Sequence, residues 1–340
     1  MTTTSTPDHD SAALAPSPAG VDTAHRRKRF TAGLDRFSGV WVLGVLILVF
    51  GLWVPDTFLQ TTTLRGIIGD QSVTAILAFG LILSVAAGAF DLSIAATMGL
   101  SSVVAMSGQQ HGYNAALSVI AAILCGTLIG VLNGFVVIRL RIDSFIATLG
   151  MSSILAAATY WVTGGRQIYN GISPSFIKFG TDAWFGIPIP VFYMAAIGAA
   201  LWFFLDFRPA GRMLYAVGGN PTAARLAGVR VERVVFLTLV ASATIAGFAG
   251  VVLAAKSGIG DPGSGPPYLL PVFTAVFLGA TQVKRGGRAN VPGTLIAIYL
   301  LATGVKGLQL AGAPAYVNDL FNGLALIVAL ALAVRTRRKT

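Results

Sequence analysis

The chain has 340 residues, of which 55% are hydrophobic and only 11% charged, and its mean hydropathy is +0.76. A soluble globular protein carries about 25% charged residues, so this deficit excludes a water-soluble fold and predicts a polytopic membrane protein. The net charge of +11 does not indicate a nucleic-acid partner, because the basic residues stand in short clusters at the ends of apolar stretches. In a membrane protein such clusters set orientation in the bilayer.

The N-terminal region lacks the residues needed to pack a core. Residues 1–37 are rich in Thr, Ser, Pro and Ala and end with a basic cluster that includes RRKR at 26–29. This composition predicts a disordered cytoplasmic tail. A transmembrane domain at 38–334 and a basic cytoplasmic C-terminus at 335–340 follow. The first apolar segment has no cleavage pattern of small residues, which predicts a retained span rather than a signal peptide.

About 20 apolar residues in a helix cross a hydrocarbon core of about 30 Å. On that basis the fold class is all-α, with about ten transmembrane helices, and the third and eighth segments have the weakest signal. Several segments are short enough to predict broken or partly re-entrant helices. The ten segments are 39–54, 67–88, 92–107, 115–138, 145–163, 188–205, 234–255, 268–283, 292–310 and 316–334.

The distribution of basic residues tests this count, because cytoplasmic loops carry an excess of Lys and Arg. With a cytoplasmic N-terminus, 19 of the 24 basic residues fall inside, in clusters at 26–36, 139–141, 208–233, 284–288 and 335–339. Both termini and the loop 206–233 are therefore predicted to be cytoplasmic. The five outer basic residues are Arg65, Arg166, Lys178, Lys256 and Lys306.

Two features predict a possible internal two-fold repeat of the halves. The tetrapeptide GTLI occurs at 126–129 and again at 293–296, an offset of 167 residues. Each half also has a glycine-rich interruption with an aspartate, AAGAFDLS at 86–93 and SGIGDPGSGPP at 257–267. Paired interruptions of this kind indicate the transport site in repeat-built transporters. We expect the segment GDPGSGPPY, at 260–268, to be ordered and non-helical on the outer side.

The loop 206–233 contains a very short helix with both ends specified. Asn220 suits the N-cap and Pro221 the first helical position, and Gly228 can adopt a left-handed stop. A helix of about seven residues is unstable alone, so it must dock, either on the protein's own cytoplasmic ends or on a soluble partner. The candidate docking residues are Gly218, Gly219, Asn220, Pro221, Thr222, Ala223, Ala224, Arg225, Leu226, Ala227 and Gly228.

Polar side chains inside the apolar segments are the candidates for a translocation pathway. A charge at mid-membrane costs about 2.5–3.5 kcal/mol, so Asp91 is expected to face a partner or a wet cavity, to cap the following span, or both. Asn133 is expected either to bond across helices or to contact a hydroxylated solute. The glycines at 126, 130 and 134 form a ridge that favours close helix packing. The candidate pathway residues are Asp91, Ser93, Asn133, Phe145 and Thr148.

Several chemistries have no support in the sequence. There is no GxxxxGK[ST] motif, so the chain does not bind ATP through a P-loop of its own. No HExxH motif, paired carboxylates or Ser/His/Asp grouping is visible, and Cys125 stands alone, which predicts no metal, no cofactor and no catalytic residues. Two alternatives stay open: an ion-coupled secondary transporter that uses Asp70 or Asp91, and an intramembrane hydrolase, although no nucleophile–base pair is evident.

Four stretches in this order resemble the permease subunits of ribose-type ABC importers: GAFDLSIAATMG, DSFIATLGM, GRMLYAVGGNPTAARLAGV and FLGATQVKRGGRANVPGTLI. The resemblance runs from about residue 70 to the end of the chain. It implies a bacterial cytoplasmic-membrane subunit that imports a monosaccharide, polyol or related hydroxylated solute by alternating access. Residues 220–228 would be the coupling helix that sits in a groove of a separate ATPase, which binds ATP and Mg. The other implied partners are an extracytoplasmic substrate-binding protein and a second permease copy.

The sequence departs from the family pattern at three places. Residues 88–90 are Gly-Ala-Phe where the family usually has Gly-Gly-Ile, and Asp143 replaces a proline. Residues 268–271 are Tyr-Leu-Leu-Pro, where the family often has Tyr-Glu-Leu-Asp. The loss of both acids predicts a subgroup whose outer gate or ligand differs.

Overall fold

The structure, a computed structural model, describes residue 2 and residues 38–283 and 287–337. The predicted tail, apart from residue 2, and part of the basic cluster at 284–288 lie outside this range. Each of the ten predicted segments overlaps one α-helix, and the bounds differ by up to six residues: α2 Ser38–Trp53, α4 Thr61–Ala86, α5 Ile94–Gln110, α6 Ala115–Arg139, α7 Ser144–Thr163, α9 Ile189–Phe207, α12 Val231–Ser257, α13 Leu269–Ala280, α14 Val291–Leu310 and α15 Tyr316–Arg337.

Six of these helices, α4, α6, α7, α9, α12 and α14, are long and apolar enough to cross a membrane. The two weakest segments are indeed short, since α5 has 17 residues and α13 only 12. The smaller elements are α3 Pro55–Phe58, α8 Pro174–Thr181, α10 Pro209–Gly219, α11 Pro221–Leu226, the 3₁₀ helix η1 Pro266–Tyr268, and a hairpin of β1 Ala183–Trp184 and β2 Ile187–Pro188. The predicted all-α polytopic fold is therefore confirmed.

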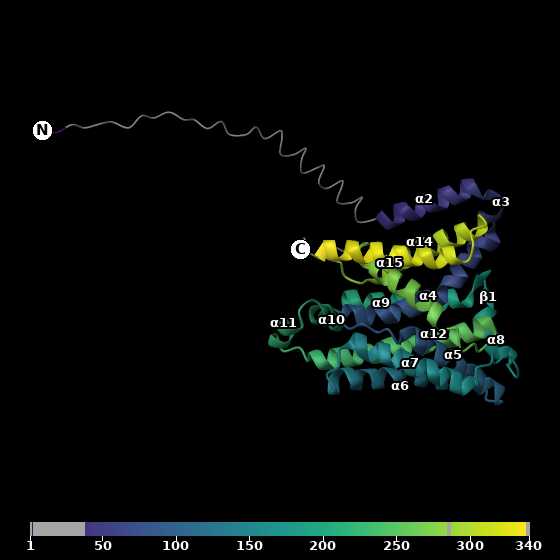
Figure 1. Cartoon of the computed structure of the whole chain (residues 1–340), viewed down its shortest axis with the longest axis horizontal. Helices are drawn as coiled ribbons and strands as arrows, with labels where there is room; N and C mark the ends of the chain where they lie inside the picture. The colour runs from purple at the N-terminus through teal and green to yellow at the C-terminus, as the bar shows by residue number, and fades with distance from the viewer. Residues whose placement is uncertain (1, 3–37, 284–286, 338–340) are drawn as a thin grey trace.

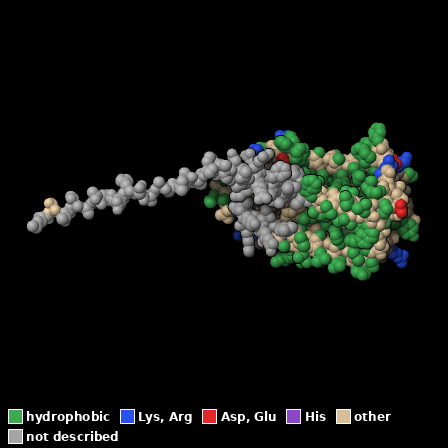
Figure 2. All heavy atoms as spheres, turned by 90° about the horizontal axis from the view of Figure 1, so that it is seen from above, with side chains coloured by type: hydrophobic (Ala, Val, Ile, Leu, Met, Phe, Trp, Pro, Cys, Tyr) green, Lys and Arg blue, Asp and Glu red, His purple; other side chains and the backbone are tan. Residues whose placement is uncertain are grey.

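The helices lie side by side, and α3, α8, α10, α11 and the hairpin lie at the two ends (Figure 1). One end carries α10 and α11, together with the start of α2 and the end of α15, and we call it the α11 end. The opposite end carries α3, α8 and the hairpin, and we call it the α8 end. Hydrophobic side chains cover most of the face seen in Figure 2, and the charged ones stand toward its ends. This is the surface that a bilayer requires of a membrane protein.

Two long helices, α4 and α12, hold the centre of the fold. Both contribute many residues to the largest buried cluster, among them Phe79 and Leu81 on α4 and Ala246 and Ala249 on α12. The predicted glycine ridge on α6 packs against α12, as expected. A Cβ atom at Gly130 would lie only 2.7 Å from the Cα atom of Val240, so the two backbones can approach this closely only with glycine there.

The helix contacts follow the pattern of the predicted repeat. In the first half α5 packs on α6 and α7, and in the second half α13 packs on α14 and α15. Across the halves, α5 and α6 pack on α12 while α13 and α14 pack on α4. In each half a long helix, α4 or α12, is thus followed by a break and a short helix, α5 or α13. The short helix contacts the long helix of the other half.

The break after α12 enters the interior instead of staying on the outer surface. Gly260 pairs with Ile168 near Met106, whereas Gly265 lies against Ala95, eleven residues back along α5. At 1.5 Å per residue this is a descent of about 16 Å, roughly half a hydrocarbon core. The segment is ordered and non-helical as far as Gly265, as expected, but residues 266–268 form the 3₁₀ helix η1. It is a re-entrant loop that ends in η1, and its small residues permit the close approach to α5.

Candidate functional site

The short helix α11 has the ends that its sequence predicts. Asn220 Oδ1 accepts a hydrogen bond from Ala223 N at 2.9 Å, and Pro221 is the first helical residue. At the other end Gly228 has a φ of +85°, and its N–H donates to Arg225 O at 3.0 Å. The helix ends at Leu226, so Ala227 is its C-cap and not a helical residue.

The helix α11 rests on the protein through one residue and exposes the others. Ala224 is buried against Val217 and Val231. Leu226, by contrast, is 86% exposed, and Arg225 forms an exposed ion pair of 2.6 Å with Glu232. A leucine exposed on this scale, on a helix too short to be stable alone, offers an apolar contact to a partner.

The sequence analysis missed the helix α10, which precedes α11 in the loop 206–233. Gly218 and Gly219, which are candidate docking residues just before the short helix, form the C-terminal end of α10. Buried Leu214 and Val217 hold α10 in place. Pro209 and three glycines make this segment look like a loop, so tertiary packing overrides a weak local propensity.

Two contacts connect α10 to the membrane helices. The Tyr215 hydroxyl donates a 2.7 Å hydrogen bond to Ala289 O, just before α14. Burial raises the pKa of Tyr215 to about 12, with a smaller contribution from Asp206, so this hydroxyl keeps its proton. Gly218 lies against the break that follows α4, where a Cβ atom on Gly88 would be 3.2 Å from the Cα atom of Gly218.

The same break leads into a buried polar network around Asp91, which is 1% exposed. Asp91 Oδ1 accepts from Ser93 N at 3.1 Å and from Ser93 Oγ at 2.7 Å, and Asp91 Oδ2 accepts from Ser242 Oγ on α12 at 3.3 Å. Asn133 Nδ2 on α6 donates to Ser93 Oγ at 2.8 Å. Asp91 therefore makes the local bond expected of a cap and a long-range bond to α12, although α5 begins only at Ile94.

Thr148 and Ser144 on α7 complete the support of this break. Thr148 Oγ1 accepts from Leu92 N at 3.0 Å, and Ser144 Oγ accepts from Phe90 N at 3.1 Å. Phe145 does not join the network, since its side chain is 48% exposed. Asp143 at the start of α7 caps this helix through Phe145 N at 2.9 Å. Four of the five candidate pathway residues thus come together, and the fifth lies outside.

A polar cavity of about 360 Å³ lies toward the α8 end, between α4, α14, α15, η1 and the start of α13. The sequence analysis did not predict this cavity. The signal that could have indicated it is the set of polar residues in α4 and α14, because a helix that packs only against apolar neighbours does not need them. Tyr268 and Pro271, from the segment that departs from the family pattern, also line it. Its other polar lining residues are Asp70, Gln71, Thr74, Lys306, Gln309 and Asn322.

Residues 63–330 match the family model described as the permease component of branched-chain amino acid transport systems. The chain belongs to this permease family. Among its relatives is the ribose import permease RbsC of Escherichia coli K12, which is 32% identical over 91% of this chain and 97% of the relative. The match extends along nearly the whole permease, so the predicted resemblance to ribose-type ABC permeases is confirmed.

Further relatives of this permease are also named for sugar transport. The D-allose permease AlsC of Escherichia coli K12 is 28% identical over 91% of this chain and 95% of the relative. The ribose import permease RbsC of Bacillus subtilis is 28% identical over 92% and 97% of the two chains. No solved structure matches the permease.

Proposed function

We propose that the permease is the membrane-spanning subunit of an ATP-driven importer for a monosaccharide, polyol or related hydroxylated solute. ATP and Mg would be bound by separate ATPase subunits, and the chain itself would perform no covalent chemistry. The relatives named for ribose and allose support the solute class. The observation that carries the proposal is the exposed helix α11, capped at both ends, which follows α10 and its contact with the break after α4.

In this proposal the α11 end faces the cytoplasm of a bacterium and the chain spans its cytoplasmic membrane. Basic residues support this orientation, because Arg208, Arg212, Arg225, Arg230 and Arg233 all fall in the segment that carries α10 and α11. A substrate-binding protein would deliver the solute at the α8 end. A second permease copy, identical or different, would complete the pore.

The contacts of α10 suggest how ATPase closure would reach the solute path. A force on α11 passes to α10, which ends at Asn220 where α11 begins. From α10 it passes through Gly218 to the break at 87–93. From there it passes through Asp91 to Ser242 and through Ser93 to Asn133. These bonds join α5 to α6 and α12, so α5 would move together with them.

The ion-coupled alternative has less support. Coupling to protons or sodium would need a carboxylate open to the passing ion, and Asp91 is enclosed by Ser93 and Ser242. Asp70 is exposed but forms an ion pair of 2.7 Å with Lys256. Asp91 is thus closed to a passing ion, and the charge of Asp70 is already balanced by Lys256.

The proposal is tested by purifying the tagged full-length chain from native membranes and identifying the ATPase subunit that accompanies it. Burying a leucine side chain contributes about 1.5–3 kcal/mol, so Leu226→Asp is expected to weaken ATPase association by about 10- to 100-fold. The matched control is Leu140→Asp. Leu140 is also an exposed leucine at the α11 end, but it lies in the connection between α6 and α7.

The comparison of the two variants decides the role of α11. Loss of the ATPase from Leu226→Asp and its retention by Leu140→Asp would support a docking helix. If the wild-type chain retains no ATPase even after crosslinking, the importer proposal fails. Equal retention by both variants would remove α11 from the interface.

A further inference from the structure

The polar cavity toward the α8 end has a charge balance that bears on the solute. Its volume of about 360 Å³ lies within the range of about 300–1,000 Å³ that small-molecule sites have. Two charged side chains line it, Asp70 from α4 and Lys306 from α14. A solute in the cavity would interact most strongly with whichever of these two charges has no ion-pair partner.

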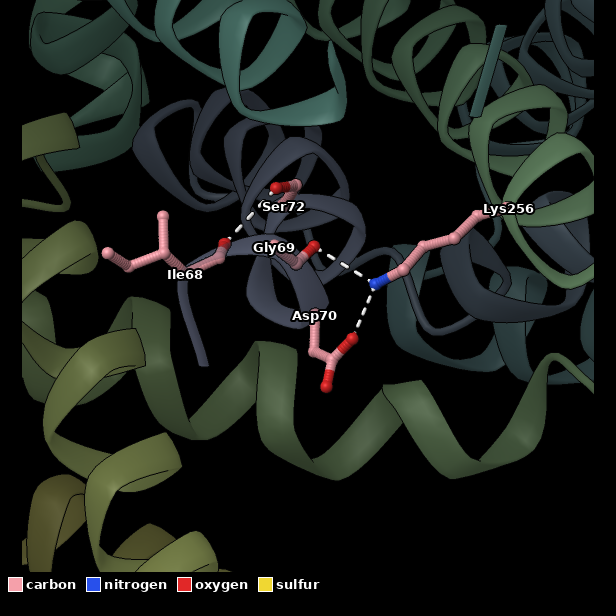
Figure 3. A network of polar contacts seen from close by, with 5 residues as sticks. All are labelled: Ile68, Gly69, Asp70, Ser72 and Lys256. Carbon is pink, nitrogen blue, oxygen red and sulfur yellow. Dashed lines mark hydrogen bonds and ion pairs between the residues drawn. The ribbon is translucent and has the colours of Figure 1, made fainter. Parts of the chain in front are cut away.

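Asp70 is already neutralised by Lys256 from α12. The Lys256 ammonium donates to Asp70 Oδ1 at 2.7 Å and to Gly69 O at 3.0 Å (Figure 3). Lys256 is the more buried partner, with 28% of its side chain exposed against 63% for Asp70. Lys256 itself does not line the cavity. A solute there would therefore contact the Asp70 carboxylate with its charge already balanced by Lys256.

Lys306 has no such partner among the described residues. It is half-buried, and it takes part in neither of the ion pairs found there, Arg225–Glu232 and Lys256–Asp70. Asp319, on the first turn of α15, is exposed and does not pair with it. The segment 268–271, which also lines the cavity, contributes no acid because its sequence is Tyr-Leu-Leu-Pro. The cavity therefore holds one uncompensated positive charge.

We propose that this cavity receives a hydroxylated solute that also carries one carboxylate, such as a sugar acid, with Lys306 as its counter-ion. This inference rests on the proposed import function and narrows its substrate class. A single carboxylate balances the charge of the cavity, whereas a phosphate monoester carries about −1.5 to −2 at pH 7 and would leave an excess. Gln71, Gln309 and Asn322 supply amide groups that donate to and accept from hydroxyls.

The test compares two solutes that differ only at one carbon: D-gluconate, which has a carboxylate, and D-glucitol, which is neutral. The full-length chain in lipid nanodiscs is titrated with each at pH 7 and constant ionic strength, and thermal stabilisation gives the half-saturating concentration. We expect the value for gluconate to be about tenfold lower, a difference of about 1.4 kcal/mol.

Lys306→Gln should abolish this preference, while Lys178→Gln should keep it. Lys178 is an exposed lysine of α8 at the same end of the molecule, outside the cavity, so it controls for the overall loss of positive charge. A wild-type chain that gluconate stabilises no better than glucitol overturns the inference, as does a preference that survives Lys306→Gln. ATPase association, measured on the same preparations, reports on the import proposal separately.

Discussion

Replacing Gly218 by alanine should loosen the contact between α10 and the membrane domain. The new Cβ atom would lie 3.0 Å from both Ala86 C and Gly88 N, and closer still to Ala86 O. Overpacking of a close contact costs about 1–3 kcal/mol. Gly219→Ala is the matched control, because its Cβ atom would meet nothing within 4 Å at the same end of α10.

Both substitutions stabilise the helix by about 0.5–1 kcal/mol, because alanine has a better helix propensity than glycine. This gain cancels when the two variants are compared, so their difference in stability comes only from the steric overlap at position 218. The remaining difference of about 1–3 kcal/mol corresponds to about 5- to 150-fold in the population of the opened segment. Hydrogen exchange measures this population for peptides that cover α10 and residues 83–90. We expect these peptides to exchange faster by that factor in Gly218→Ala than in Gly219→Ala. Equal exchange in the two variants would refute the argument that this contact joins α10 to the break.

Two other predictions concern the helices behind this contact. Asp91→Ala leaves buried donors without an acceptor, which costs about 1–3 kcal/mol for each, whereas Asp91→Asn keeps one side-chain oxygen as an acceptor. The melting temperature should therefore fall from wild type to Asp91→Asn and again to Asp91→Ala. Equal melting temperatures for the two variants would contradict the hydrogen-bond network around Asp91. Gly130→Ala should lower stability by about 1–3 kcal/mol through overlap with α12. Gly150→Ala, inside α7, meets nothing within 4 Å and should raise stability by about 0.5–1 kcal/mol through better helix propensity. Similar losses in both variants would show that the glycine ridge is not a packing surface.

Local chemistry made several features predictable from sequence. The cap of α11 depends on atoms at Asn220 and Ala223, three residues apart, so the residue types alone specify it. The positions of the helices follow from apolar length, because a bilayer leaves the backbone no other way to satisfy its hydrogen bonds. The two breaks were also visible, since glycine and proline have the lowest helix propensities and each break contains at least one of them together with an aspartate.

The partners of each polar residue could not be predicted in the same way. The Ser242 that bonds to Asp91 is 151 residues away, and nothing near either residue indicates the pairing. The helix α10 was missed because its stability comes from buried contacts with other elements and not from its own sequence. Phe145 was expected beside the other pathway residues, but its helix turns it outward, away from the Asp91 network.

Composition, span positions, caps and breaks were therefore determined by the sequence itself, because each depends on residues within one or two helical turns. Only the tertiary structure decided which charges meet. It paired Lys256 with Asp70 across 186 residues. It left Lys306, which the sequence shows only as another outer lysine, beside a cavity and without an ion-pair partner among the described residues. The physical reason is that packing of α4, α12, α13, α14 and α15 sets the distances between these groups, and electrostatic energy depends on those distances and not on order along the chain.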